Sequence, residues 1–192
     1  MRWFLGLTAA IAGERLGELI WSRAHERRMS RRGGAVVREP WYAAMVAVHA
    51  GTLVAAPLEA TLRRSRTPPL VRGAALGALA AATALRIWTL RTLGDSWSTR
   101  VTRFDGAGRR VVTRGPYRFI RHPNYLAVIL ELAAFPLAGG AWMTALAATA
   151  LNALVLHHRI PLEERELAHD PAWRAAMLGR PRFLPLKRPS VA

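Results

Sequence analysis

Long apolar stretches separated by arginine-rich stretches form the main pattern along this chain. The clearest apolar stretch covers residues 41–62, close to the roughly 20 residues that one membrane-crossing helix needs. A second stretch, residues 72–91, is rich in Gly and Ala, which favours close packing against neighbouring helices. The pattern predicts an all-α integral membrane protein with about five transmembrane helices.

A helical hairpin is predicted over residues 125–160. Its apolar arms, 125–138 and 141–156, are each short for a full span. Gly139 and Gly140 lie between them and predict a tight turn.

The first apolar stretch, residues 3–21, is interrupted by Glu14, Arg15 and Glu18. A signal peptide is disfavoured because Arg2 alone is a weak positive region. Ionisable residues inside a span usually face a bundle interior or a wet cavity. The alternative is that the helix end reaches into the cytoplasm, with Arg15 and Glu18 forming a structural pair.

The positions of the arginines predict the orientation of the chain. They concentrate in three stretches, at residues 22–40, at 92–121 and after His158. The positive-inside rule places these stretches in the cytoplasm, so five spans would put the N-terminus outside and the C-terminus inside. Four arginines then fall on the outer side against the rule: Arg63, Arg64, Arg66 and Arg72.

Composition narrows the class of protein further. Of the 192 residues, 52% are hydrophobic, which excludes a disordered chain, and the net charge of +16 suits an anionic membrane face. A nucleic-acid binder is the least favoured reading, because the basic residues are dispersed over loops between spans. The absence of cysteine excludes a disulfide scaffold, a thiolate metal site and a cysteine nucleophile.

The chain divides into an N-terminal transmembrane part, residues 1–91, and a catalytic part, residues 92–192. Within the second part, Asp105-Gly106 and Gly108 predict a turn between two short strands near Val101 and Val111-Val112.

The first candidate site is the basic and aromatic segment 114–125, which reads Arg-Gly-Pro-Tyr-Arg-Phe-Ile-Arg-His-Pro-Asn-Tyr. Pro123 is typical of a first helical turn, and a helix N-terminus there would suit an anionic group. The alternative is an interfacial anchor, in which Tyr and Arg meet lipid headgroups.

The second candidate site follows the hairpin, at residues 157–164. Arg159 and Glu163 are four residues apart and so share one helical face. No known zinc spacing includes His157 and His158, so we expect no metal site. The alternative is a basic helix end balanced by acidic residues.

Taken together, these motifs resemble the isoprenylcysteine carboxyl methyltransferase family, in a bacterial integral membrane form. The resemblance rests on Gly115-Pro116-Tyr117, on Arg121-His122-Pro123 with Tyr125, on Glu163-Glu164, and on the ending Arg182-Phe183-Leu184-Pro185. The opening Glu14-Arg15-Leu16-Gly17-Glu18-Leu19 also looks like that of bacterial members.

The resemblance implies an enzyme that uses S-adenosylmethionine to methylate a lipophilic acceptor. It implies cofactor-binding roles for Tyr117, Arg121, His122, Pro123, Tyr125 and Glu164, and catalytic roles for Arg159 and Glu163. The tail departs from the family pattern, since Trp173 stands near the place of a common tyrosine.

The acceptor stays open at this point. It can be isoprenylcysteine-like, with a carboxyl oxygen, or alkylpyrone-like or alkylresorcinol-like, with a hydroxyl. The high Arg content, with a single Lys, indicates a bacterial chain. Together with the positive-inside rule, this predicts a location in the inner membrane with the active site facing the cytoplasm. Two alternatives are an NAD(P)H-dependent membrane reductase of the sterol or enoyl type, and a basic membrane scaffold.

Overall fold

The computed structural model describes residues 2–63, 67–104 and 111–184. Its elements, in chain order, are α1 (Arg2–Arg31), β1 (Gly34–Val36), α2 (Tyr42–Arg63), α3 (Pro69–Leu93), the 3₁₀ turn η1 (Gly94–Ser96), β2 (Thr102–Phe104), the 3₁₀ turn η2 (Gly115–Arg118), α4 (Pro123–Gly139), α5 (Trp142–Leu167) and α6 (Pro171–Met177).

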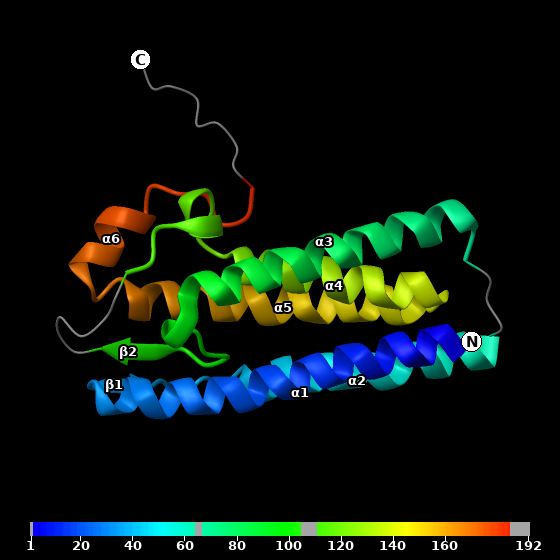
Figure 1. Ribbon diagram of the computed structural model, residues 1–192, viewed down its shortest axis with the longest axis horizontal. Coiled ribbons are helices and arrows are strands. Elements are labelled where there is room, and N and C mark those ends of the chain that lie inside the picture. The colour runs from blue at the N-terminus through cyan, green and yellow to red at the C-terminus, as the bar shows by residue number, and fades with distance from the viewer. Residues whose placement is uncertain (1, 64–66, 105–110, 185–192) are drawn as a thin grey trace, which may run out of the picture.

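The five long helices lie side by side in two layers, with α1 and α2 below α3, α4 and α5 (Figure 1). Helix α3 packs along α4, α4 along α5, and α2 against α5 and α4, whereas α1 packs more loosely. One end of the bundle collects β1, β2, η1, η2 and α6 around the helix ends (Figure 1). Two arginine-rich stretches, residues 22–40 and the described residues of 92–121, lie at this end, which we call the basic end.

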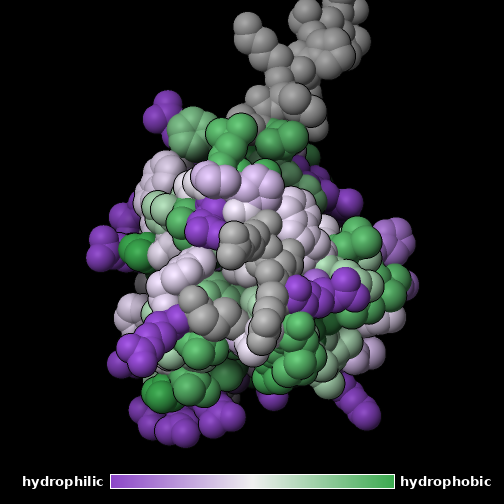
Figure 2. Space-filling view, turned by 90° about the vertical axis from the view of Figure 1, so that its right-hand side faces the viewer, coloured by the Kyte–Doolittle hydropathy of each residue, from purple (hydrophilic) through white to green (hydrophobic). Residues whose placement is uncertain are grey.

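Two helices, Tyr42–Arg63 and Pro69–Ser96, are long and apolar enough to cross a membrane, and Pro123–Gly139 is a shorter apolar helix. Large apolar side chains on these and neighbouring helices are exposed, including Leu62 at 73% and Leu146 at 73%. Seen from the end opposite the basic end, hydrophobic side chains cover much of the surface between projecting hydrophilic ones (Figure 2). The helical membrane fold is supported, and the count of five spans stays a prediction.

The predicted hairpin and its turn are confirmed. Helix α4 ends at Gly139, Gly140 takes the left-handed φ of 83° that ends the helix, and α5 begins at Trp142. Phe4 stacks on Phe135, with ring centroids 5.1 Å apart, and lies directly against Gly139. The second arm is longer than predicted, because α5 continues through Pro161 to Leu167.

The predicted end of the first helix is wrong. Helix α1 does not stop near Trp21 but continues to Arg31, so residues 22–31 are helical rather than loop. No Gly or Pro occurs between Gly17 and Gly33 to end the helix.

The two short strands are only partly as predicted. Thr102–Phe104 does form a strand, but its antiparallel partner is Gly34–Val36, with Gly34 opposite Phe104. Residues 111–113 form no strand in the described part of the chain. The predicted turn at Asp105-Gly106 and Gly108 lies outside the described residues, as does Pro185.

Candidate active site

A cavity of about 450 Å³ lies between the two helix layers and extends to the basic end. Every long helix contributes to its lining, and six of the predicted site residues do so as well: Tyr117, Arg121, His122, Tyr125, Arg159 and Glu163. The other two predicted site residues, Pro123 and Glu164, are not part of this lining. Its volume is within the roughly 300–1,000 Å³ of small-molecule sites.

Arg159 is buried in the wall of this cavity and is paired by the connection between α1 and α2. Its Nε lies 2.9 Å from Oε2 of Glu39, and both side chains are less than 5% exposed. The guanidinium also contacts the backbone oxygen of Thr99 and the sulfur of Met45. Burial raises the pKa of the Glu39 carboxyl above its usual value, and the charge of Arg159 only partly offsets this.

Tyr125 and Glu163 form the opposite part of the same site. The Tyr125 hydroxyl donates a hydrogen bond to Oε2 of Glu163, and the Arg159 guanidinium carbon lies 5.9 Å from the centroid of the Tyr125 ring. Arg159 and Glu163 therefore meet around one aromatic ring, as their spacing of four residues on α5 allows. A cation, an aromatic face and a carboxylate thus face one cavity.

Glu164 joins three segments behind the cavity. Its Oε1 lies 2.9 Å from Nε2 of His122 and 3.2 Å from Nη1 of Arg121, and its Oε2 accepts a hydrogen bond of 2.6 Å from Arg182. Although burial raises the pKa of Glu164, the hydrogen bonds from His122 and Arg182 outweigh this and hold that pKa at about 2. This bridge fixes the His122 ring at the start of α4.

The C-terminal tail is bonded to the same place. The backbone N–H groups of Arg121 and His122 donate to the carbonyl oxygens of Pro181 (2.9 Å) and Arg182 (3.1 Å). Arg180 contacts the Tyr117 carbonyl oxygen. The described part of the tail is thereby held against the start of α4 and the Tyr117 segment.

Trp173 of α6 lies in the cavity wall at this end. It is buried with Leu167 and Met177, and Tyr117 packs against this cluster. The departure from the family pattern at Trp173 therefore leaves an aromatic side chain beside the cavity.

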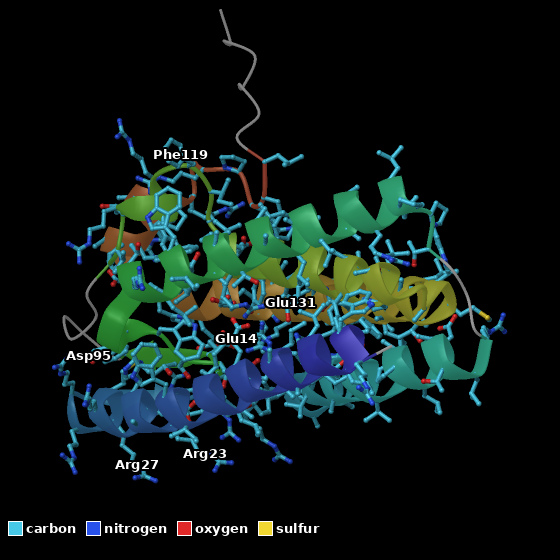
Figure 3. The ribbon with its side chains drawn as sticks, turned by 45° about the vertical axis from the view of Figure 1, so that its right-hand side comes forward. Glu14, Arg23, Arg27, Asp95, Phe119 and Glu131 are labelled. Carbon is cyan, nitrogen blue, oxygen red and sulfur yellow. The ribbon has the colours of Figure 1, made fainter. Side chains whose placement is uncertain are left out.

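The inner end of the cavity is polar too, because Arg15, Glu18 and Arg86 line it. Arg15 donates two hydrogen bonds to the Glu131 carboxylate, of 2.8 and 2.7 Å, and Arg86 donates one of 2.6 Å. Glu131 lies between the layers, whereas Arg23 and Arg27 point away from the bundle (Figure 3). Arg15 and Glu18 therefore face the bundle interior, as the first interpretation expected, and they also form the structural pair that the alternative expected.

Sequence reasoning missed Glu39 and Glu131. Glu131 had a usable signal, because a lone carboxylate in an apolar helix requires a buried cation, and Arg86 was the matching lone cation. Glu39 had none, since it lies next to Pro40 in a basic stretch and its partner is 120 residues away.

This chain is similar to a known protein family and to one bacterial protein. Residues 75–169 match the model of the isoprenylcysteine carboxyl methyltransferase (ICMT) family. The chain is also 28% identical, over 161 residues, to the uncharacterized protein YpbQ of Bacillus subtilis (strain 168), covering 84% of this chain and 94% of that protein. The match includes most of α3, all of α4 and α5, and the residues around His122.

Proposed function

Residues 75–169 belong to the isoprenylcysteine carboxyl methyltransferase family, and from that premise we propose that this chain methylates a hydroxyl oxygen of a lipophilic acceptor, using S-adenosylmethionine. The observation that carries the proposal is the arrangement of Arg159, Tyr125 and Glu163 around one cavity that reaches both the basic end and the apolar helix faces. The family match gives no support to the reductase alternative.

The basic end of the cavity suits S-adenosylmethionine, which supplies an electrophilic methyl group on a sulfonium. Trp97 supports the fit, because its indole Nε1 is buried without a hydrogen-bond partner in the described part of the chain and Trp97 lines the cavity. Tyr117 and Trp173 offer aromatic surface there, Arg121 offers a cationic group and His122 offers an imidazole ring. Aromatic faces stabilise a nearby cation, which suits a sulfonium.

The charges around Arg159 favour a hydroxyl acceptor over a carboxylate. Arg159 already has Glu39 as its ion partner, and Glu163 stands across the Tyr125 ring. An acceptor carboxylate would bring a third anion to one buried cation, and burying an uncompensated charge is costly. A neutral hydroxyl avoids this cost.

The roles of the residues follow from these contacts. Glu163 would accept the proton of the acceptor hydroxyl as its oxygen displaces the thioether of S-adenosylmethionine from the methyl carbon, so that one C–O bond forms while one C–S bond breaks. Arg159 donates hydrogen bonds to the reacting oxygen and stabilises its developing charge. Tyr125 holds the Glu163 carboxylate in place, and the buried setting excludes water.

The lipid tail of the acceptor has a path from the membrane side. Leu16 of α1 and Val46 of α2 both line the cavity, and they are 62% and 38% exposed. The cavity therefore opens between α1 and α2 on a face covered by apolar side chains. We place the basic end in the cytoplasm of a bacterium, at the inner membrane, because its exposed arginines obey the positive-inside rule.

Titration calorimetry on the detergent-purified protein tests the proposal. We expect S-adenosylmethionine to bind, NADPH not to bind, and the His122→Ala variant to lose the binding. With methyl-labelled cofactor, label should pass to an alkylresorcinol and not to a prenylated cysteine carboxylate. Absence of S-adenosylmethionine binding, or transfer to the carboxylate alone, would overturn it.

A further inference from the structure

The polar cluster at the inner end of the cavity contains two cations and two anions from three helices. Arg15 and Glu18 come from α1, Arg86 from α3 and Glu131 from α4. All four side chains are at least 86% buried. Glu14, which is 32% exposed, approaches Arg15 at 3.8 Å from the outer side. The positive and negative charges of the cluster thus nearly cancel without a ligand.

The two carboxylates of the cluster are not equivalent. Both oxygens of Glu131 accept hydrogen bonds from arginines, and Glu131 does not line the large cavity. Glu18 uses only Oε2, which contacts Arg15 and lies 3.5 Å from Arg86. Its Oε1 is buried without a hydrogen-bond partner among the described residues, in a side chain that is 10% exposed and lines the cavity.

A buried carboxylate oxygen without a partner is costly, and its environment indicates what would satisfy it. Because these charges nearly cancel, a charged ligand group beside Glu18 is disfavoured. The oxygen lacks a hydrogen-bond donor, and a neutral hydroxyl supplies one at no cost in charge.

The inner cluster lies close to the reacting groups. Arg159 contacts Met45, and His49, four residues or about 6 Å further along α2, lines the inner part of the same cavity. On α4, Asn124 accepts a hydrogen bond of 3.4 Å from Arg86 and is adjacent to Tyr125 in the chain. Glu18, Arg159 and Glu163 all line this one cavity, so a single acceptor molecule in it can contact both the reacting groups and the inner cluster.

We propose that Glu18 binds a second hydroxyl group of the methyl acceptor, so that the enzyme prefers a lipid whose aromatic or enolic head group carries two hydroxyls. One hydroxyl reacts between Arg159 and Glu163, and the other donates a hydrogen bond to Oε1 of Glu18. This inference rests on the proposed methyltransferase function. It makes Glu18 a specificity residue, whereas Glu131, which does not line the cavity, has no direct contact with the acceptor.

The test compares two acceptors with the same alkyl chain, a 5-alkylresorcinol and a 3-alkylphenol, in three proteins. The parent should favour the resorcinol in kcat/KM by about 10- to 100-fold, the range of one hydrogen bond to a charged group. Glu18→Met should lose most of this preference, mainly through a higher KM for the resorcinol. Glu131→Gln removes a charge from the same cluster, away from the cavity, and should keep the preference even where stability falls.

Two results would overturn the proposal. One is equal use of both acceptors by the parent, and the other is an equal loss of preference in Glu131→Gln, which would mean a general effect of the cluster. Calorimetric binding of the two lipids without cofactor separates this proposal from the methyltransferase function. Even where no turnover is detected, the parent must bind the resorcinol more tightly, and equal binding contradicts the role of Glu18.

Discussion

Glu39 and Arg159 form a buried ion pair, Nε to Oε2 at 2.9 Å, between the connection that precedes α2 and the half of α5 at the basic end. The pair links the N-terminal helices to the site residues of the family region. It holds Arg159 beside the Tyr125 ring, with its guanidinium charge compensated before any acceptor arrives.

Glu39→Gln should therefore lower both activity and stability. Removing one partner of a buried ion pair costs about 3–5 kcal/mol, and misplacing a reacting group can cost up to about 100-fold in rate. Methyl-transfer kinetics and a thermal melt in detergent measure the two effects. Glu59→Gln is the matched control, because Glu59 binds the start of α5 at the opposite end of the bundle. It should leave kcat/KM near the parental value, and unchanged activity in Glu39→Gln would refute the role of the pair.

Glu163→Gln should lower kcat by about 100-fold or more, the usual contribution of a general base. The affinity for S-adenosylmethionine should stay the same, because the lost group acts on the acceptor proton. Tyr125→Phe keeps the ring and removes only the hydroxyl that donates to Glu163, so its loss should be smaller. Single-turnover rates with labelled cofactor distinguish the two variants. A Glu163→Gln protein with parental kcat would show that another group takes the proton.

The bridge at Glu164 should make stability depend on acidity. Its pKa is held at about 2, below the ordinary 4.5, so the ionised carboxylate stabilises the fold fully above about pH 4.5. That contribution falls as the pH drops from about 4.5 towards 2. Melting temperatures of the parent and of Glu164→Gln, taken across this window, should therefore differ most at its upper end and converge at its lower end. A constant difference would contradict the assignment.

Gly139→Ala should destabilise the hairpin. A Cβ at Gly139 would lie 2.3 Å from the Phe4 ring, which is buried against Phe135, so overpacking of about 1–3 kcal/mol is expected. Gly77→Ala on α3 is the control, because a Cβ there meets no atom within 4 Å. It should leave stability unchanged or raise it by up to about 1 kcal/mol. Both are read from thermal melts in one detergent.

The orientation can be measured directly because the chain contains no cysteine. Arg27→Cys marks the exposed basic end, and Leu70→Cys marks the start of α3 at the opposite end, where the side chain is 85% exposed. A membrane-impermeant thiol reagent should label only Leu70→Cys in spheroplasts with an intact inner membrane. Inverted membrane vesicles should give the reverse result. Labelling of Arg27→Cys in intact spheroplasts would contradict the cytoplasmic placement of the site.

The helices were largely predictable from the sequence, and the limits of that prediction have physical causes. Apolar runs locate α2, α3 and the hairpin, because a helix in lipid must be apolar along its lipid-facing length. The same rule misplaced the end of α1, since hydropathy marks where a helix leaves the membrane and not where its hydrogen bonds stop. Residues 22–31 are polar and still helical.

The site residues could be predicted only where they lie close together in the sequence. Arg159 and Glu163 share one helix, and Tyr117 to Tyr125 form one segment, so spacing alone could group them. Glu131 and Arg86 could have been paired from the sequence, because each is a lone charge inside an apolar helix. Glu39 depends on which segments become neighbours in space, which a single sequence does not encode in any short pattern. The strand partner of Thr102–Phe104 was missed for the same reason, because it lies near residue 35 rather than just across the turn.

The two backbone hydrogen bonds from Arg121 and His122 to Pro181 and Arg182 also impose an order of assembly. Synthesis runs from the N-terminus, so α1 to α5 can enter the membrane while residues 181 and 182 are still to be translated. Until those residues emerge from the ribosome, nothing fixes the tail across the start of α4. The start of α4, with the proposed cofactor-binding residues Arg121 and His122, therefore gains these contacts only after α1 to α5 have been made.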